Sequence, residues 1–115
     1  MNEDFVPFEL AVKLKEKWFP QEDSVRYDEQ GELYIGDNDY PVCVAPTISQ
    51  VLKWLREEKM WIIVIRLYEK NGWYWFIQDN NGELRASQLA SVDECFSTYE
   101  QAALVGIEYV LDNLI

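Results

Sequence analysis

The pattern of apolar and polar positions is clearest in the middle of the chain. Residues 61–68 and 73–78 are two runs rich in aromatic and β-branched side chains, and the short segment 70–72, Lys-Asn-Gly, separates them. Such runs favour β-strands, and a short Asn-Gly loop between them favours an antiparallel hairpin. The pattern therefore predicts that this hairpin forms the centre of a sheet.

The register of this hairpin is predicted from the requirement that one of its faces be uniformly apolar. If residues 70–72 form the loop, Leu67 lies opposite Trp75. Ile65 then lies opposite Ile77 on the same face, whereas a one-residue slip would mix the two faces. The other face is mixed and aromatic, and it carries Ile62, Val64, Arg66, Tyr68, Tyr74, Phe76 and Gln78.

Two capping boxes predict the starts of two helices. Thr47-Ile-Ser-Gln50 and Ser97-Thr-Tyr-Glu100 each place a hydroxyl three positions before a side chain that can return a hydrogen bond. Apolar positions follow at helical spacing, which predicts helices near 48–58 and 98–113. Gly106 lies inside the second helix, where glycine costs about 1 kcal/mol relative to alanine. We therefore expect a packing reason for this glycine.

The first 46 residues carry weaker patterns. Residues 7–18 favour a short helix, and residues 25–35 alternate apolar and polar positions around Gly31, which favours a small hairpin. Residues 40–46 contain two prolines and should run extended as a connector, because a residue before proline avoids the helical region. We expect this part of the chain to precede the main sheet.

Together these elements predict a single two-layer α+β domain over residues 1–115, which is an ordinary size for one domain. After the central hairpin, residues 79–82 form a turn and residues 83–87 a third antiparallel strand. The core is then an α-β-β-β-α unit at about 47–115, with a helix and a small hairpin before it in residues 1–46.

The charge is strongly acidic but unevenly spread. The formal net charge of −11 comes from 21 acidic and 10 basic side chains. Residues 47–87 hold five acids and six bases, whereas residues 88–115 hold five acids and no base. A field of this sign repels phosphate and anionic lipid, so we expect neither direct nucleic-acid binding nor membrane binding. The ordinary role of such a negative charge is to keep the protein in solution. The alternative is that the chain is an acidic nucleic-acid mimic that inhibits a DNA-binding enzyme.

The candidate chemistry is sparse. There is no histidine, which removes the commonest general base near neutral pH and the histidine-based nucleophile systems. Cys43 and Cys95 are too few for a thiolate zinc site. Asp37 and Asp39 lie in a turn, and Asp79–Glu83 has its glycine at the fourth position where a calcium loop has it at the sixth. We expect no catalytic residue, metal or cofactor; an enzyme using carboxylates alone is a third hypothesis.

The compartment predicted from the sequence is the cytosol. No apolar run reaches the roughly 18–20 residues that span a bilayer, and the first residues, Met-Asn-Glu-Asp, are unlike a secretory leader. We expect Cys43 and Cys95 to be reduced and buried. A disulfide between these two cysteines is the alternative that the sequence leaves open.

The aromatic face of the central hairpin is the remaining candidate for function. Its candidate contact residues are Arg66, Tyr68, Tyr74 and Phe76. Such a face needs a cover, which could be residues 1–46, a second copy of the chain or a partner; we favour the first. The leading hypothesis is a non-catalytic module that binds another protein or itself.

Two short motifs carry a resemblance that covers about residues 40–115. They are Ala45-Pro-Thr-x-x-x-Val51-x-x-Trp54-Leu-Arg-Glu57 and Phe96-x-x-Tyr99-Glu-x-Ala102, with the aromatic hairpin between them. In these motifs the chain resembles a group of short proteins of unknown function from gut anaerobic bacteria and from phage or mobile-element gene clusters. The resemblance implies a small accessory protein, and it assigns no catalytic residue.

Overall fold

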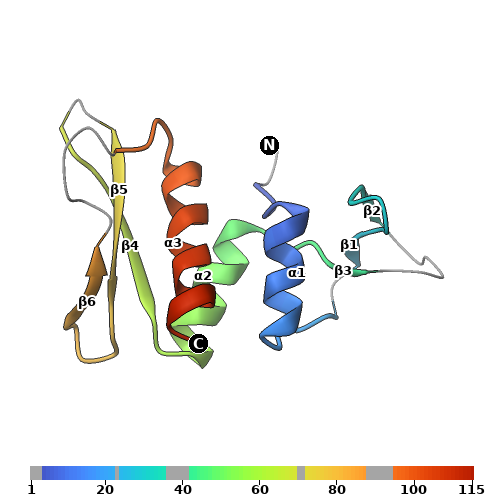
Figure 1. Cartoon of the computed structure of the whole chain (residues 1–115), viewed down its shortest axis with the longest axis horizontal. Coiled ribbons are helices and arrows are strands. Elements are labelled where there is room, and N and C mark those ends of the chain that lie inside the picture. Colours follow the sequence, from blue (N-terminus) through green and yellow to red (C-terminus); the bar gives the residue numbers. More distant parts are fainter. Residues whose placement is uncertain (1–3, 23, 36–41, 70–71, 88–94) are drawn as a thin grey trace. The chain divides into compact units, whose positions relative to one another are not determined.

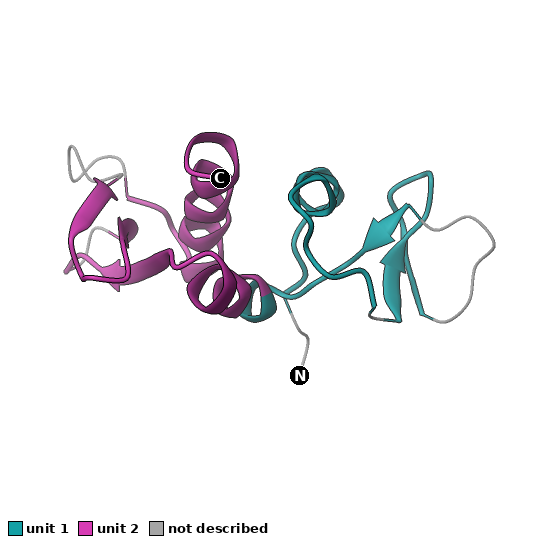
Figure 2. Cartoon of the chain, turned by 90° about the horizontal axis from the view of Figure 1, so that it is seen from below, with its two compact units in different colours: residues 1–50 teal, residues 51–115 magenta. Residues whose placement is uncertain are grey.

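The chain is an α+β protein, as predicted. Its computed structural model shows three helices and two antiparallel three-stranded sheets among the described residues (Figure 1). The chain divides into two compact units, residues 1–50 and 51–115 (Figure 2). No described helix is long and apolar enough to cross a membrane. The residues that the structure describes are 4–22, 24–35, 42–69, 72–87 and 95–115.

The order of the elements confirms the predicted α-β-β-β-α run and the helix and hairpin before it. The helices predicted near 48–58 and 98–113 are both present. The elements are α1 (Phe8–Glu16), β1 (Val25–Tyr27), β2 (Leu33–Ile35), β3 (Cys43–Val44), α2 (Ile48–Glu58), β4 (Ile62–Leu67), β5 (Trp73–Gln78), β6 (Leu84–Ser87) and α3 (Tyr99–Asn113).

In the second unit, the strand order is β4-β5-β6, and α3 packs on one face of this sheet (Figure 1). The predicted capping box at Ser97–Glu100 is wrong by one residue. Thr98 caps α3 by accepting a hydrogen bond from the Gln101 N–H at 3.1 Å, and the Gln101 side chain accepts one from the Ser97 N–H. A Cβ added to Gly106 would lie 3.1 Å from Cγ2 of Ile63 and 3.3 Å from Cγ of Trp75. The packing reason expected for this glycine is therefore confirmed.

The predicted register of the central hairpin is wrong by two residues. Leu67 pairs with Trp73 and not with Trp75. The Tyr68 N–H donates to the Gly72 carbonyl at 2.7 Å, so the loop lies between these two residues. A shift of two leaves every side chain on its predicted face, because side chains along a strand alternate with a period of two. The division into an apolar and an aromatic face is thus confirmed.

Gly72 lies in a tightly enclosed position at the start of β5. Its φ is 119°, and a Cβ added there would collide with the backbone oxygen of Phe96. Next to it, the Trp73 N–H donates to the Phe96 carbonyl at 2.8 Å, and the Phe96 N–H donates back at 2.7 Å. The segment before α3 therefore pairs with the start of β5 in an antiparallel bridge, and its close approach requires glycine at position 72.

The small sheet of the first unit has the order β2-β1-β3. The segment predicted as a connector at 40–46 contains β3, which pairs with β1; residues 40 and 41 lie outside the described residues. The interpretation as a connector was wrong because an extended chain with free backbone groups adds to a neighbouring strand edge. The Tyr27 hydroxyl on β1 donates to the Val6 carbonyl at 2.5 Å.

The hairpins β1–β2 and β5–β6 use the same turn. In each, an aspartate Oδ1 accepts hydrogen bonds from the backbone N–H groups two and four residues later. Gly31 and Gly82, three residues after Asp28 and Asp79, adopt φ values of 79° and 82°. The short motif Asp-x-x-Gly-Glu-Leu therefore occurs twice, at 28–33 and 79–84.

Replacement of Gly72 by alanine tests the crossing at the start of β5. Because Gly72→Ala adds both backbone strain and a collision with Phe96, we expect it to lower the free energy of unfolding by about 2–4 kcal/mol. The matched control is Gly82→Ala, where φ is positive but the added Cβ meets nothing within 4 Å. The control should lose about 1 kcal/mol. Equal losses for both variants in urea denaturation would contradict this account.

Candidate interaction surface

The four predicted contact residues lie together on the sheet face opposite α3. We call Arg66, Tyr68, Tyr74 and Phe76 the aromatic patch. Arg66 pairs directly with Tyr74 across β4 and β5. Helix α3 approaches Ile63 on the other face, so the even-numbered positions of both strands point away from it. The structure thus places the aromatic patch on one continuous surface of the second unit.

The rings of the aromatic patch contact one another. Tyr74 lies at the centre, with its ring centroid 6.2 Å from Tyr68 in an edge-on arrangement and 6.1 Å from Phe76 in a stacked one. The guanidinium of Arg66 lies 5.7 Å from the Phe76 ring centroid. Such cation–π contacts contribute about 0.5–1 kcal/mol at exposed sites. The four side chains therefore hold one another in place.

The side chains of the aromatic patch differ in their exposure to solvent. Arg66 is exposed, whereas the three rings are half-buried. Leu84 on β6 pairs with Gln78 and is 62% exposed, so it adds an apolar side chain to the same face. The surface combines apolar area, ring edges and one cationic group.

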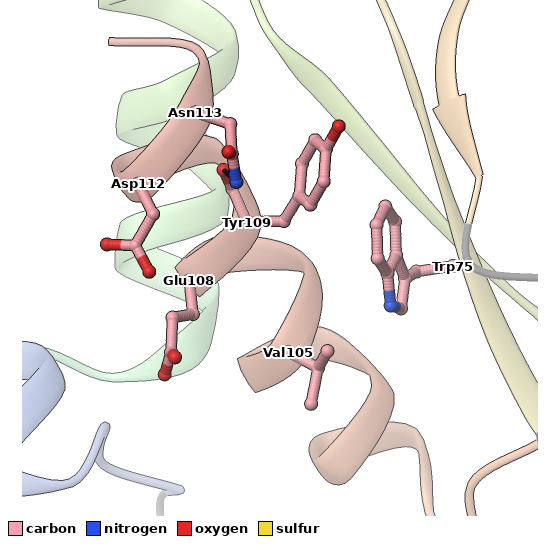
Figure 3. A pocket seen from close by; sticks show the side chains of 6 residues that line it. All are labelled: Trp75, Val105, Glu108, Tyr109, Asp112 and Asn113. Atoms are coloured by element: carbon pink, nitrogen blue, oxygen red, sulfur yellow. Dashed lines mark hydrogen bonds between the residues drawn. The ribbon is translucent and has the colours of Figure 1, made fainter.

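A second feature is a hollow on the helix side of the sheet, between β5 and α3, with a volume of about 240 Å³ (Figure 3). Trp75 is 4% exposed and its ring lies 5.2 Å from that of Tyr109. The Nε1–H of Trp75 has no acceptor, which costs about 1–3 kcal/mol for a buried donor. The lining residues are Trp75, Val105, Glu108, Tyr109, Asp112 and Asn113.

The side chains around this hollow are not arranged as an acid–base pair. Figure 3 shows the Tyr109 ring pointing toward Trp75, while the carboxylates of Glu108 and Asp112 point away from it. A general acid or base must lie within hydrogen-bond reach of the proton that it transfers. The pattern of apolar positions gave no sign of this hollow, because Tyr109 and Val105 read as ordinary exposed positions of a helix.

Asp79 has a structural role. Its Oδ2 accepts from Nε of Arg85 at 2.8 Å and pairs with Nη2 at 2.7 Å, while its Oδ1 accepts two backbone N–H groups. Enclosure by the protein opposes ionisation, but the hydrogen bonds and charge of Arg85, together with the backbone donors, lower the pKa of Asp79 below its ordinary value. The interpretation of residues 79–82 as a turn is confirmed.

The other candidate residues have simple surroundings. Both cysteines are free thiols in the structure. Cys43 is buried, as predicted, and burial raises its pKa. The predicted burial of Cys95 is wrong, because its side chain is only half-buried. Asp37 and Asp39 lie outside the described residues. Within the part of the chain that is described, no group of three or more His, Cys, Asp or Glu side chains could hold a metal ion.

Comparison with known proteins assigns no family to the chain. No protein-family model, curated protein or solved structure matches it. The similarity to short accessory proteins of bacteria and phages stays a prediction. Functional proposals for this chain rest on its own surface chemistry.

The effect of pH tests the role of Asp79. A lowered pKa in the folded state stabilises the fold above the ordinary aspartate pKa of about 3.8, and this stabilisation is lost as the pH falls through the folded-state value. We expect Asp79→Asn to lower the urea midpoint at pH 7, with the difference from the unchanged chain vanishing in strong acid. A difference that persists below both pKa values would contradict this role.

Proposed function

We propose that the chain is a non-catalytic protein-interaction module whose contact surface is the aromatic patch. The observation that supports this proposal is the contact of three rings and one guanidinium on the sheet face that α3 leaves open. Tyrosine and arginine are among the residues that contribute most energy at protein interfaces. Rings that already hold one another lose little conformational entropy on binding.

The composition of the aromatic patch indicates the chemistry of its partner. Arg66 needs a carboxylate or a carbonyl oxygen to satisfy its donors, whereas the rings and Leu84 need apolar area. The chain carries a net charge of −11, so a partner that is acidic overall would be repelled. We therefore propose a protein that is neutral or basic overall and presents a single acceptor for Arg66 within an apolar surface. An accessory role in the cytosol belongs to the same proposal.

In the alternative, a nucleic-acid mimic, acidic side chains take the places of phosphates and should therefore be regularly spaced along one surface. The acids of α3 are Glu100, Glu108 and Asp112, which are separated by eight and then four residues. Because this spacing is uneven, α3 adds no support to the alternative, which stays a prediction from net charge.

Site-specific crosslinking in cells tests the proposed surface. A photo-crosslinking residue at position 68 should capture one defined partner. The same residue at position 99, where Tyr99 is 37% exposed on α3, is the matched control and should not capture it. Adding Arg66→Glu should weaken the captured complex by about tenfold or more, because charge reversal at a central contact costs over 1.4 kcal/mol.

The contrary outcomes are specific. Capture of the same proteins from positions 68 and 99 would indicate non-specific contact and would contradict the proposal. Unchanged capture after both Arg66→Glu and Tyr74→Ala would place the contact elsewhere. Circular dichroism of each variant shows whether the fold is retained.

A further inference from the structure

The turn between β5 and β6 contains an asparagine followed by a glycine, Asn81-Gly82, which lies outside the aromatic patch. Both residues are exposed, and a Cβ added to Gly82 would meet no atom within 4 Å. The side-chain amide of asparagine has a carbonyl carbon that the backbone nitrogen of the next residue can attack when that residue is small. Glycine hinders this attack least, because it has no side chain.

The attack exchanges one nitrogen for another at the side chain of Asn81. The Gly82 nitrogen loses its proton to a hydroxide ion and forms a bond to Cγ of Asn81. The bond from Cγ to the side-chain nitrogen breaks, and this nitrogen takes a proton from water and leaves as ammonia. Water then opens the cyclic imide at either carbonyl, which gives aspartate or isoaspartate. The reaction consumes one water and releases one ammonia, so water is the only reagent besides the chain itself.

The turn must open before this bond can form. In the folded turn, the Gly82 N–H donates to the Asp79 carbonyl at 3.0 Å, and the Asn81 N–H donates to Oδ1 of Asp79 at 2.9 Å. Opening breaks these bonds but uncovers no buried side chain among residues 80–84, because each of them is already exposed. Local openings that expose backbone hydrogen bonds and lose few apolar contacts require the least free energy.

The turn at residues 28–33 offers an internal comparison. It has the same aspartate hydrogen bonds, and its glycine, Gly31, has a φ of 79° against 82° at Gly82. The residue before this glycine is Gln30, which is exposed as Asn81 is. The glutamine side chain is longer by one CH₂ group, so attack would close a larger ring and fix more rotatable bonds. The longer side chain makes this turn the less reactive of the two.

We propose that Asn81 is a site of spontaneous modification, at which the chain converts its own side-chain amide to aspartate and isoaspartate. Asn80 lies in the same exposed turn, but the residue after it is Asn81, whose side chain hinders the attack. We therefore expect one of these two adjacent asparagines to convert and the other to persist. At the other Asn-Gly pair, Asn71 lies outside the described residues.

The modification alters the hairpin that holds β6. Isoaspartate adds one CH₂ group to the main chain at position 81, which displaces Glu83 relative to Asp79. The Asp79 N–H donates to the Glu83 carbonyl, and the Glu83 N–H donates to Oδ1 of Asp79, both at 3.0 Å in the unmodified turn. We expect both bonds to weaken, so the converted chain should have a lower urea midpoint than the unconverted one.

The test is incubation of the purified full chain in neutral buffer at physiological temperature, followed by proteolysis and mass spectrometry. Asn81 should convert within weeks to aspartate and isoaspartate, while Asn80 and Gln30 stay unchanged. Asn81→Gln should slow conversion at this turn by about tenfold or more, because ring closure depends steeply on geometry. This variant should keep its fold, because the side chain at position 81 is exposed.

Two further variants separate the turn from the rest of the chain. Gln30→Asn gives the first turn an Asn-Gly pair and should make position 30 convert. Tyr74→Ala in the aromatic patch should leave the rate at Asn81 unchanged, so this result is independent of the proposed function.

Three outcomes overturn the proposal. The first is an Asn81 side chain that stays intact throughout the incubation. The second is conversion of Asn80 at the same rate as Asn81, which would remove the role of Gly82. The third is absence of conversion at position 30 in Gln30→Asn, which would show that a glycine in this turn does not permit the attack.

Discussion

The pairing of β4 with β5 is the constraint on which the second unit depends. Its register sets Leu67 against Trp73 and Ile63 against Ile77, which gives α3 an apolar surface to cover. The same register sets Arg66 beside Tyr74 on the opposite face, where the rings meet one another. One hydrogen-bonded ladder therefore produces both the core and the candidate contact surface, because side chains alternate along each strand.

Two glycines make this arrangement possible by allowing close approach. Gly72 lets the Phe96 backbone pair closely with the start of β5, and Gly106 lets α3 approach Ile63 and Trp75. At both positions the absence of a side chain lets neighbouring atoms lie close to the glycine backbone. Any larger residue there would require these neighbours to shift. The close fit on the helix side contrasts with the opposite face, where the rings of the aromatic patch are half-buried and Arg66 is exposed.

The sequence was sufficient to predict the elements and the faces, because helical spacing, capping boxes and strand alternation are local signals. It was not sufficient for the register, because a shift of two residues leaves every side chain on the same face and so leaves the apolar pattern unchanged. Strand β3 was missed because its pairing with β1 joins segments with no shared local pattern. The hollow at Trp75 and Tyr109 was not predicted for the same reason, because it forms only where β5 and α3 pack together.

The most direct test of this account is the pattern of Hα–Hα nuclear Overhauser effects across the central hairpin. Non-hydrogen-bonded antiparallel pairs bring their Cα atoms to about 4.5 Å, so their Hα atoms give strong signals. We expect strong signals between Leu67 and Trp73 and between Ile65 and Trp75. A strong signal between Leu67 and Trp75 in their place would contradict the register and, with it, the positions of the two glycine contacts.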